Sequence, residues 1–575
     1  MRIKTALSIK QLKLVNVLIF FGFSWFILVF LIIPNINTVY TVFVQNGIFT
    51  LTPLYKLLNS SRAMVSLRNS FILAPTLSLT VGFIGVSIVF ITEYFDIKGA
   101  RILRLGYMTT LIYGGIILVS GYKFMYSYNG YLTIMMSRII PNFNRNWFQG
   151  YWAVLFVMTF ACTSNHMIFL RNAMRSVDFQ TVEAAQNMGA SQATILLRVV
   201  LPVLTPSLLA VTILTFITGL GATSAPLLVG GADFQTITPM ILFFANTIGS
   251  RDLAALLALF LGLASVILLV ILTQLEKRGN YLSVSKVKTT IVKQKIHNPI
   301  LNAIAHVYAY LLFLIYVAPV VLIILFSFTN SSSIGRRQLS FSSFTISNYI
   351  SVFTKASAYR PFMVSIIYSG LAALSVALLI LLACRIITKQ KNRLGESLEY
   401  SFLIPWLLPN TLIAIGLVTT YNISRWFMFG KILTGTLFVL FIGYVIIKIP
   451  FTLRMTKAAF FAIDDSLEDA AKNLGAKTLY TFVRVILPVI MPTVLAIFAL
   501  NFNSLLGDYD MSVFLYHPLS MPLGVYIKQL TDNQSNADNA VLTFVYAVLM
   551  MIISGIVLYL VYGRGSRDSF GEHNK

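Results

Sequence analysis

The side chains that could carry out chemistry are few and scattered along the 575-residue chain. The histidines, at positions 166, 297, 306, 517 and 573, include no pair at the spacing of metal ligands, and Cys162 and Cys384 lie in separate apolar segments. Two isolated cysteines form neither a disulfide framework nor a metal site. Because no cluster of His, Asp or Glu accompanies them, we expect no catalytic residue, no metal site and no membrane-embedded enzyme.

A second group of polar residues could line a path for a solute. Asn501 and Asn503 lie inside an apolar segment, where polar side chains usually face the interior of a helix bundle. Both pore lining and helix–helix hydrogen bonding fit this position. Asp508 and Asp510 follow the same segment, and such acids either attract a cation or are simply solvated loop residues.

The composition indicates that these polar residues lie on or between membrane-spanning helices. Hydrophobic residues make up 57% of the chain, charged residues 11%, and the mean hydropathy is +0.81. A soluble globular protein has about 25% charged residues. The chain is therefore predicted to be an all-α integral membrane protein that contacts lipid.

About 20 apolar residues are needed to cross the hydrocarbon core, and twelve segments meet this length. Lys448 is the clearest charge within them, and we expect it near a helix end where its stem can snorkel. The first segment is too long for a signal peptide and lacks a cleavage signal, so it is predicted to be an uncleaved span. The predicted spans are 15–33, 71–91, 105–121, 151–170, 199–218, 253–273, 303–328, 363–384, 400–420, 432–451, 485–503 and 541–562.

The net charge of +24 indicates how the spans are oriented. With twelve spans, 29 of the 43 Lys and Arg residues lie on the same side of the membrane as the N-terminus. Short cytoplasmic loops carry the excess of Lys and Arg. Both termini are therefore predicted to be cytoplasmic, and the positive charge faces anionic lipid, so that no nucleic-acid partner is needed to explain it.

One cytoplasmic loop occurs twice in the chain. The residues Glu183–Ala190 read E-A-A-Q-N-M-G-A, and Asp469–Ala476, 286 positions later, read D-A-A-K-N-L-G-A. Over 183–207 and 469–493, eleven of 25 aligned positions are identical, including Pro202 with Pro488, whereas chance would give one or two. The same offset aligns Gly221 with Gly507 after the following span. The chain is therefore an internal duplication.

The duplication predicts two halves, 1–273 and 301–575, joined by a basic cytoplasmic linker at 274–300. Because each half holds six spans, both begin on the same side, as in parallel repeats related by a pseudo-two-fold axis along the membrane normal. Within each loop, a short helix is expected to end at Gly189 or Gly475 in the left-handed conformation. A second helix then enters the membrane. One such loop alone would be an ordinary interfacial helix, but two matching copies argue against that reading.

Both loops resemble the EAA loop of the permease subunits of ATP-binding-cassette importers, which reads E-A-A-x-x-x-G-A and is followed at a distance by L-P. The second copy departs mildly, with Asp469 at the acidic position and Glu468 before it. The resemblance covers both halves. Two permease halves in one polypeptide are similar to the ferric-iron importer permeases, and the thiamine and aminoethylphosphonate relatives share this layout.

This resemblance implies a subunit of the bacterial inner (cytoplasmic) membrane that works with two copies of an ATP-binding subunit and an extracytoplasmic substrate-binding protein. The chain has no G-x-x-x-x-G-K-[ST] phosphate loop, so it is expected to bind no cofactor, and Mg-ATP is expected on the partner subunits. The resemblance also implies a translocation path near Gly221, Gly507, Asn501, Asn503, Asp508 and Asp510. The residues implied to couple to the ATP-binding subunits are Glu183, Ala184, Ala185, Gly189, Ala190, Asp469, Ala470, Ala471, Gly475 and Ala476.

Substrate and transport class have alternatives. Ferric iron or a small iron chelate is the first expectation, although it depends on the two-half layout because no residue cluster has the spacing of a ferric site. Thiamine, aminoethylphosphonate and polyamines are the alternatives within the same class. An ion-coupled secondary transporter with a 6+6 repeat would require charges near the middle of the spans, and it would leave the doubled loop unexplained.

Overall fold

A computed structural model of the protein describes residues 20–45, 47–174, 177–278, 293–389, 393–461, 463, 465–532 and 537–562. Within these residues the fold is helical, apart from one short antiparallel pair of strands, β1 (Val44–Gln45) and β2 (Ile48–Phe49). Ten helices are long and apolar enough to cross a membrane, or up to twelve if each of two bent pairs forms one span. The predicted all-α membrane fold is therefore confirmed.

The chain forms two compact units, and each unit combines segments from distant parts of the sequence. Unit 1 comprises Met1–Pro53, Lys355–Tyr526 and Met550–Lys575, and unit 2 comprises Leu54–Thr354 and Ile527–Leu549. The predicted halves at 1–273 and 301–575 describe the sequence repeat and stay a prediction. Most of the predicted linker, residues 279–292, lies outside the described residues.

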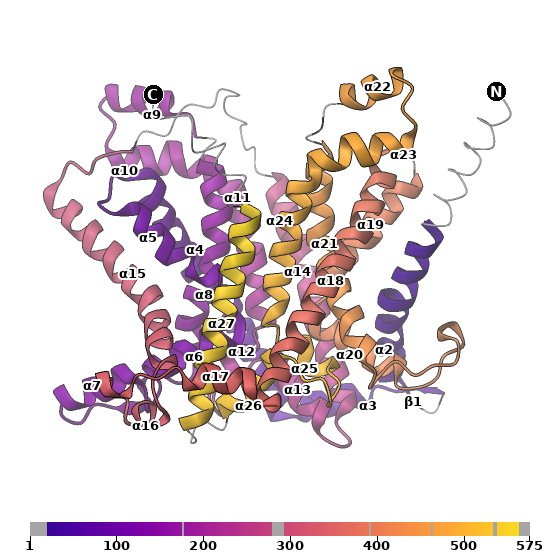
Figure 1. Ribbon diagram of the computed structural model, residues 1–575, viewed down its shortest axis with the longest axis horizontal. Coiled ribbons are helices and arrows are strands. Elements are labelled where there is room, and N and C mark those ends of the chain that lie inside the picture. Colours follow the sequence, from indigo (N-terminus) through magenta and orange to yellow (C-terminus); the bar gives the residue numbers. More distant parts are fainter. Residues whose placement is uncertain are drawn as a thin grey trace. The chain divides into compact units, whose positions relative to one another are not determined.

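The long helices of unit 2 are α4 (Ser61–Val89), α8 (Tyr151–Met174), α11 (Leu201–Leu220), α14 (Arg251–Arg278) and α15 (Pro299–Ser327). Shorter elements join them (Figure 1). These are α3 (Thr52–Asn59), η2 (Phe90–Tyr94), α5 (Ala100–Tyr107), η3 (Met108–Leu111), α6 (Gly115–Tyr126), α7 (Tyr131–Ile139), η4 (Arg145–Trp147), α9 (Phe179–Asn187), α10 (Gln192–Ile195), η5 (Leu196–Val200), α12 (Ser224–Val229), α13 (Ile237–Asn246), α16 (Ser331–Arg336), η6 (Phe341–Ser343) and α17 (Ser347–Thr354).

The long helices of unit 1 are α18 (Ala356–Lys389), α21 (Leu437–Phe461) and α24 (Leu487–Leu506), together with the N-terminal span Phe20–Phe43. The helices α26 (Leu523–Asp532) and α27 (Ala537–Tyr562), and the start of α3, contribute residues to both units. The remaining elements are η1 (Leu28–Ile32), α2 (Ile33–Phe43), α19 (Arg393–Leu407), α20 (Asn410–Tyr421), η7 (Trp426–Met428), α22 (Asp465–Asn473), α23 (Thr478–Thr481), η8 (Phe482–Ile486) and α25 (Ser512–Leu515).

Two of the predicted spans are not straight helices. The span predicted at 105–121 falls on Ala100–Leu111 and Gly115–Ile139, which bend by 115°, and the span at 400–420 falls on Gly395–Leu407 and Asn410–Tyr421, which bend by 101°. At the first break Gly115 has φ 56°, a conformation that costs glycine little. At the second break Pro409 adopts extended backbone before α20. Because hydropathy is averaged over a window of residues, it does not detect such a break. It therefore predicted each bent pair of helices as one continuous span.

The first span also differs from its prediction at 15–33, because its described part extends from Phe20 to Phe43. Pro34 does not end it, since the π-helical turn η1 precedes α2 and places the proline in its first turn. The polar residues that follow find partners on α20: Asn37 donates to Thr420 at 3.1 Å, and Thr38 lies 3.3 Å from Thr419. Interhelical hydrogen bonds therefore allow the polar end to remain helical.

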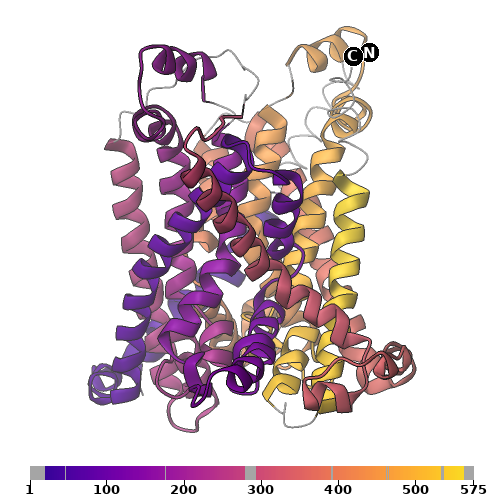
Figure 2. The same cartoon turned by 90° about the vertical axis from the view of Figure 1, so that its left-hand side faces the viewer.

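The sequence repeat has a structural counterpart at matching positions of the two units. Ser70 on α4 accepts a hydrogen bond from the Ile237 backbone N–H at 2.9 Å, and Ser365 on α18 accepts one from the Leu523 N–H at 2.8 Å. Positions 237 and 523 differ by the repeat offset of 286, whereas the two serines are 295 positions apart and occur on the helices α4 and α18 of the respective units. In each unit the long helices extend from the end that carries α9 or α22 to the opposite end (Figure 2). The two copies of the repeated loop thus occupy the same end of their respective units.

Candidate functional site

Each repeated loop begins with a short helix that ends in the same hydrogen-bonded turn. In α9, Gly189 N–H donates to Gln186 O at 2.9 Å and Ala190 N–H donates to Ala185 O at 3.0 Å. In α22, Gly475 N–H donates to Lys472 O at 2.9 Å and Ala476 N–H to Ala471 O at 3.0 Å. This pair of bonds defines a Schellman motif, which requires a left-handed residue after the helix. Gly189 and Gly475 supply it, with φ of 79° and 81°.

The paired alanines of each loop have different roles. Ala184 and Ala470 are exposed, whereas Ala185 and Ala471 are buried. The carbonyl group of the buried alanine accepts the hydrogen bond from the alanine N–H five positions later. Its small side chain leaves room for that later alanine to pack against it. The acidic residues before the alanines, Glu183 and Asp469, are exposed. Each loop therefore presents an acid, an alanine and the glycine turn on one outward face.

A π-helical turn links each loop to its membrane-spanning helix. The turns η5 and η8 are separated by the repeat offset, and each directly precedes a leucine–proline pair. Leu201 N–H donates to Leu196 O, and Leu487 N–H donates to Phe482 O, across five residues in each case. Pro202 and Pro488 have no N–H to donate, and the π-turn shifts the hydrogen-bond register there without breaking the span.

The first loop is anchored by apolar packing. Phe179, Val182 and Ala185 of α9 belong to a buried cluster with residues of α4, η2, α8 and α11. The described end of the predicted linker adds hydrogen bonds: Gln186 donates to the Gln294 side chain at 2.6 Å, and Gln192 donates to Lys295 O at 2.6 Å. Apolar burial fixes α9 to the spans beneath it.

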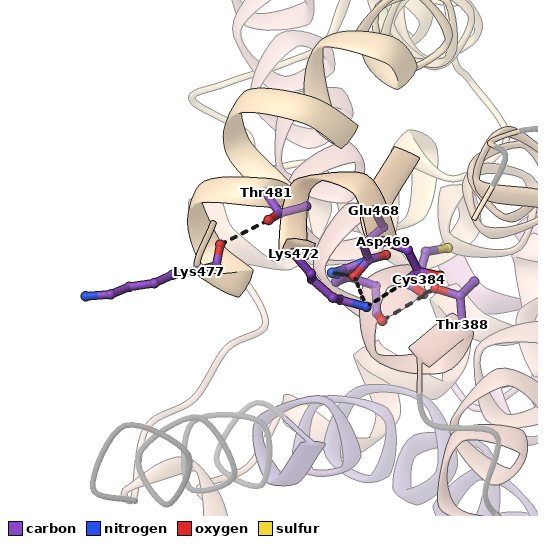
Figure 3. A network of polar contacts seen from close by, with 8 residues as sticks. Cys384, Thr388, Glu468, Asp469, Lys472, Lys477 and Thr481 are labelled. Carbon is purple, nitrogen blue, oxygen red and sulfur yellow. Dashed lines mark hydrogen bonds and ion pairs between the residues drawn. The ribbon is translucent and has the colours of Figure 1, made fainter. Parts of the chain in front are cut away.

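The second loop is anchored by an ion pair instead. Glu468 occupies the position equivalent to Val182, and Arg385 of α18 donates to both of its carboxylate oxygens, at 3.0 and 3.2 Å. The Arg385 guanidinium also lies 5.5 Å from the centre of the Phe482 ring in η8. Figure 3 shows the Glu468 and Lys472 side chains close to the end of α18, near Cys384 and Thr388, while Lys477 points away. One arginine thus connects α18, α22 and η8.

The sequence reasoning did not single out the residue before each glycine. Met188 is 81% exposed and Leu474 is 89% exposed, and these residues are equivalent in the repeat. A large apolar side chain at the tip of a loop marks a surface suited to a protein partner. The sequence does contain a sign of this surface, because positions 188 and 474 both hold a large apolar residue directly before the glycine of the turn. We use the name coupling surface, after the role that the sequence predicts for it, for Glu183, Ala184, Met188 and Gly189 in the first loop and for Asp469, Ala470, Leu474 and Gly475 in the second.

The asparagines of the candidate path make interhelical contacts. Asn501 on α24 is buried and donates to the Thr452 hydroxyl on α21 at 2.8 Å. Asn503 donates to Ser554 O on α27 at 3.4 Å, so it faces another helix. Of the two readings left open by the sequence, helix–helix hydrogen bonding is the one that these contacts support.

Asp508 lies at the start of a short capped turn rather than in a solvated loop. Its carboxylate accepts from the backbone N–H groups of Met511 and Ser512, at 3.2 and 3.0 Å. Burial raises the pKa of Asp508, while the Ser512 N–H and the Lys448 ammonium act in the opposite direction. Asp510, two residues later, is half-buried.

Lys448 was expected near a helix end, and that expectation is wrong. It lies near the middle of the 25-residue helix α21, because this helix continues to Phe461 rather than ending near residue 451. Tyr444, Lys448 and Thr452 share one face of α21 at intervals of four residues. With Asn501 and Asp508 they form a polar seam in unit 1.

The glycines of the candidate path belong to different units. Gly507 ends α24 in unit 1 and Gly221 ends α11 in unit 2, with φ of −108° and −88°. Neither φ requires glycine. Among the described residues, no group of three or more His, Cys, Asp or Glu side chains could hold a metal ion.

Comparisons with known proteins place the chain in a family. The model of the "binding-protein-dependent transport system inner membrane component" matches residues 296–567. A probable ABC transporter permease of Sinorhizobium fredii is 37% identical over 540 residues, covering 93% of this chain and 94% of that protein. A putative ferric transport system permease of Haemophilus influenzae is 22% identical over 535 residues, covering 90% of this chain and 80% of that protein. A putative 2-aminoethylphosphonate permease of Salmonella paratyphi A is 24% identical over 212 residues, covering 37% and 78%.

The helical membrane fold and the doubled loop define the chain as a transport permease. It belongs to the family of binding-protein-dependent ABC importer permeases. Members of this family work with ATP-binding and substrate-binding partners, and the multi-pass fold agrees with a location in the inner membrane.

Proposed function

We propose that this chain is the complete translocation unit of an ABC importer, with one coupling loop for each of two ATP-binding subunits. The repeated turn carries the proposal. Two loops of one chain present the same outward face of an acid, an alanine, a large apolar side chain and a left-handed glycine. Two equivalent surfaces fit two copies of one partner.

The coupling surfaces transmit movement because each is fixed to a membrane-spanning helix. When ATP binding brings the two partner subunits together, α9 and α22 move with them. The π-turns and the helices α11 and α24 carry that motion into the membrane, and the path alternates between outward and inward access. ATP shifts this equilibrium only by its differential affinity for the two states. In this proposal Mg-ATP binds to the partner subunits. Both termini of this chain face the cytoplasm.

The transported solute is proposed to be ferric iron or a small iron chelate, delivered by an extracytoplasmic binding protein. The ferric transport relative, which matches along 90% of this chain, supports this choice. The aminoethylphosphonate relative matches a shorter part of the chain and makes that solute the second candidate. Binding measurements on the partner binding protein with ferric iron, aminoethylphosphonate, thiamine and polyamines distinguish these solutes.

The test of the coupling surfaces replaces Met188 and Leu474 with Asp in the same chain, co-expressed with its ATP-binding subunit. Apolar residues at the centre of an interface contribute about 2 kcal/mol or more each when they are hot spots. We expect the double variant to lose co-purification of the ATP-binding subunit and to lose ATP-driven uptake.

The matched control is Ile248→Asp, because Ile248 is 98% exposed and lies in the loop between α13 and α14 at the other end of unit 2. This variant should retain the ATP-binding subunit. Undiminished co-purification of the Met188→Asp, Leu474→Asp variant would refute the proposed coupling surfaces.

A further inference from the structure

A small polar cavity lies in unit 2. The helix α6, whose end contributes to its lining, lies toward the end of unit 2 opposite α9 (Figure 1). It has a volume of about 190 Å³ and is formed by the end of α6, the segment from η4 to α8 and the end of α12. Its polar lining consists of Lys123, Ser127, Tyr128, Asn146 and Gln149. Sites for drug-sized ligands measure roughly 300–1,000 Å³, so this cavity suits a smaller ligand.

The lining is rich in hydrogen-bond donors and positively charged. Lys123 carries the one formal charge among the residues that line the cavity. The side chains of Lys123, Asn146 and Gln149 make no hydrogen bond with another residue that the structure describes. An ammonium group has three donors and no acceptor, and each amide adds two donors. The ammonium group and the two amide groups can therefore donate hydrogen bonds to a ligand that accepts them.

The neighbouring acidic residues do not neutralise the cavity. Asp532 interacts electrostatically with Lys123 and is also paired with Lys528 at 2.5 Å, and Lys528 in turn repels Lys123. One carboxylate therefore serves two ammonium groups, which leaves one positive charge uncompensated. Asp233 follows Gly231 by two residues and does not line the cavity. A half-buried ammonium that shares its counter-ion with a second ammonium is only partly compensated, and a charge-assisted hydrogen bond to an anion offsets the remaining cost.

We propose that this cavity binds a small oxyanion, that is, a phosphate, phosphonate or carboxylate group. The site is separate from the coupling surfaces, and its existence does not depend on which solute is imported. Two sources supply the same chemistry: a free anion from the outer medium, or the phosphate of a phospholipid headgroup.

The first experiment measures binding of inorganic phosphate to the purified full-length chain in maltoside detergent and chloride buffer. We expect saturable binding of one phosphate per chain, weakened by at least about tenfold in Lys123→Gln. The matched control is Arg145→Gln, which removes one positive charge from η4, outside the lining, and should bind phosphate like the wild type. Absence of saturable binding in the wild type would overturn the proposal, as would equal weakening by both substitutions.

A second pair of variants tests the volume of the cavity. A Cβ atom at Gly231 would lie 2.2 Å from Gln149 Nε2, whereas one at Gly150 has no atom within 4 Å. Both glycines have positive φ, 66° and 80°, so an alanine causes backbone strain at either position. Gly231→Ala should weaken phosphate binding and Gly150→Ala should not. Equal binding by the two variants would contradict the assignment.

The source of the anion follows from the same assay in nanodiscs. If a lipid headgroup fills the cavity, phosphatidylglycerol nanodiscs should abolish the phosphate binding seen in detergent, and Lys123→Gln should lower the amount of phosphatidylglycerol that co-purifies. If the ligand is a free anion, binding should be the same in both preparations. Each result supports the oxyanion site and identifies its source.

Discussion

At the scale of single residues, the repeated motif can be explained position by position. The second alanine is buried and accepts the bond that closes the turn, while the glycine adopts the left-handed conformation. The first alanine and the acidic residue remain exposed, although Asp469 also accepts a hydrogen bond from Lys472 at 3.2 Å. The motif therefore combines residues that form the turn with exposed residues that we propose to contact the ATP-binding subunit.

The first prediction concerns the two glycines. A Cβ at Gly189 or Gly475 would meet no atom within 4 Å, so alanine there acts only through backbone strain of roughly 1–2 kcal/mol. We expect Gly189→Ala combined with Gly475→Ala to fold, to show faster hydrogen exchange in α9 and α22, and to transport more slowly. Gly82→Ala is the control, because Gly82 lies inside α4 without a positive φ and a Cβ there also meets no atom within 4 Å. Unchanged exchange and transport in the double variant would contradict the role of the turn.

At the scale of elements, the helices α9 and α22 of the repeated loop have different anchors. Val182 in the first loop is part of an apolar cluster, and its equivalent Glu468 forms a two-bond ion pair with Arg385. The side chains of Glu468 and Arg385 are 8% and 16% exposed. Removing one member of a buried pair leaves the other charge uncompensated. The second helix therefore depends on a single contact more than the first does.

The second prediction follows from this difference. Glu468→Ala should loosen α22 by about 2–3 kcal/mol, seen as faster hydrogen exchange in α22 and weaker coupling of ATP hydrolysis to transport. Glu468→Val with Arg385→Met should restore part of the loss, because it recreates the apolar contact of the first loop. Lys472→Ala removes a half-exposed partner of the same carboxylate and should have little effect. An equal effect of Lys472→Ala and Glu468→Ala would argue against the anchor.

At the scale of the whole molecule, segments far apart in sequence share a unit. The N-terminal span packs in unit 1, where the Tyr421 hydroxyl of α20 donates to Val29 O. The helix α15 packs in unit 2, where the Tyr107 hydroxyl of α5 donates to Ala309 O at 2.7 Å. Each unit thus needs a helix that the sequence repeat assigns to the other half.

The third prediction tests this exchange by dividing the chain within residues 279–292. Because each fragment contributes to both units, co-expressed fragments should co-purify in equal amounts, and either fragment alone should accumulate poorly in the membrane. An uncut chain with a protease site at the same position provides the control. Two fragments that separate cleanly and remain stable would contradict the exchange of helices.

Several features were accessible from sequence because they depend on local properties. Hydropathy and length predicted the membrane class and most spans, and turn chemistry predicted the left-handed glycines at 189 and 475. Hydropathy averaged along the chain did not predict the span boundaries where a helix breaks or where a hydrogen-bond partner on another helix keeps a polar segment helical. The bends near Gly115 and Pro409 divided two predicted spans, and Asn37 and Thr38 remain in a helix because α20 supplies hydrogen-bond partners.

The sequence by itself determined that this chain is a membrane protein with a duplicated loop, because apolar content and residue identity at a fixed offset are properties of the chain alone. Only the tertiary structure decided that Glu468 binds Arg385, that Asn501 faces Thr452 and that the first helix belongs with α20. These contacts join residues separated by dozens to hundreds of positions. A polar side chain in an apolar helix requires a partner, but which helix supplies it depends on packing in three dimensions.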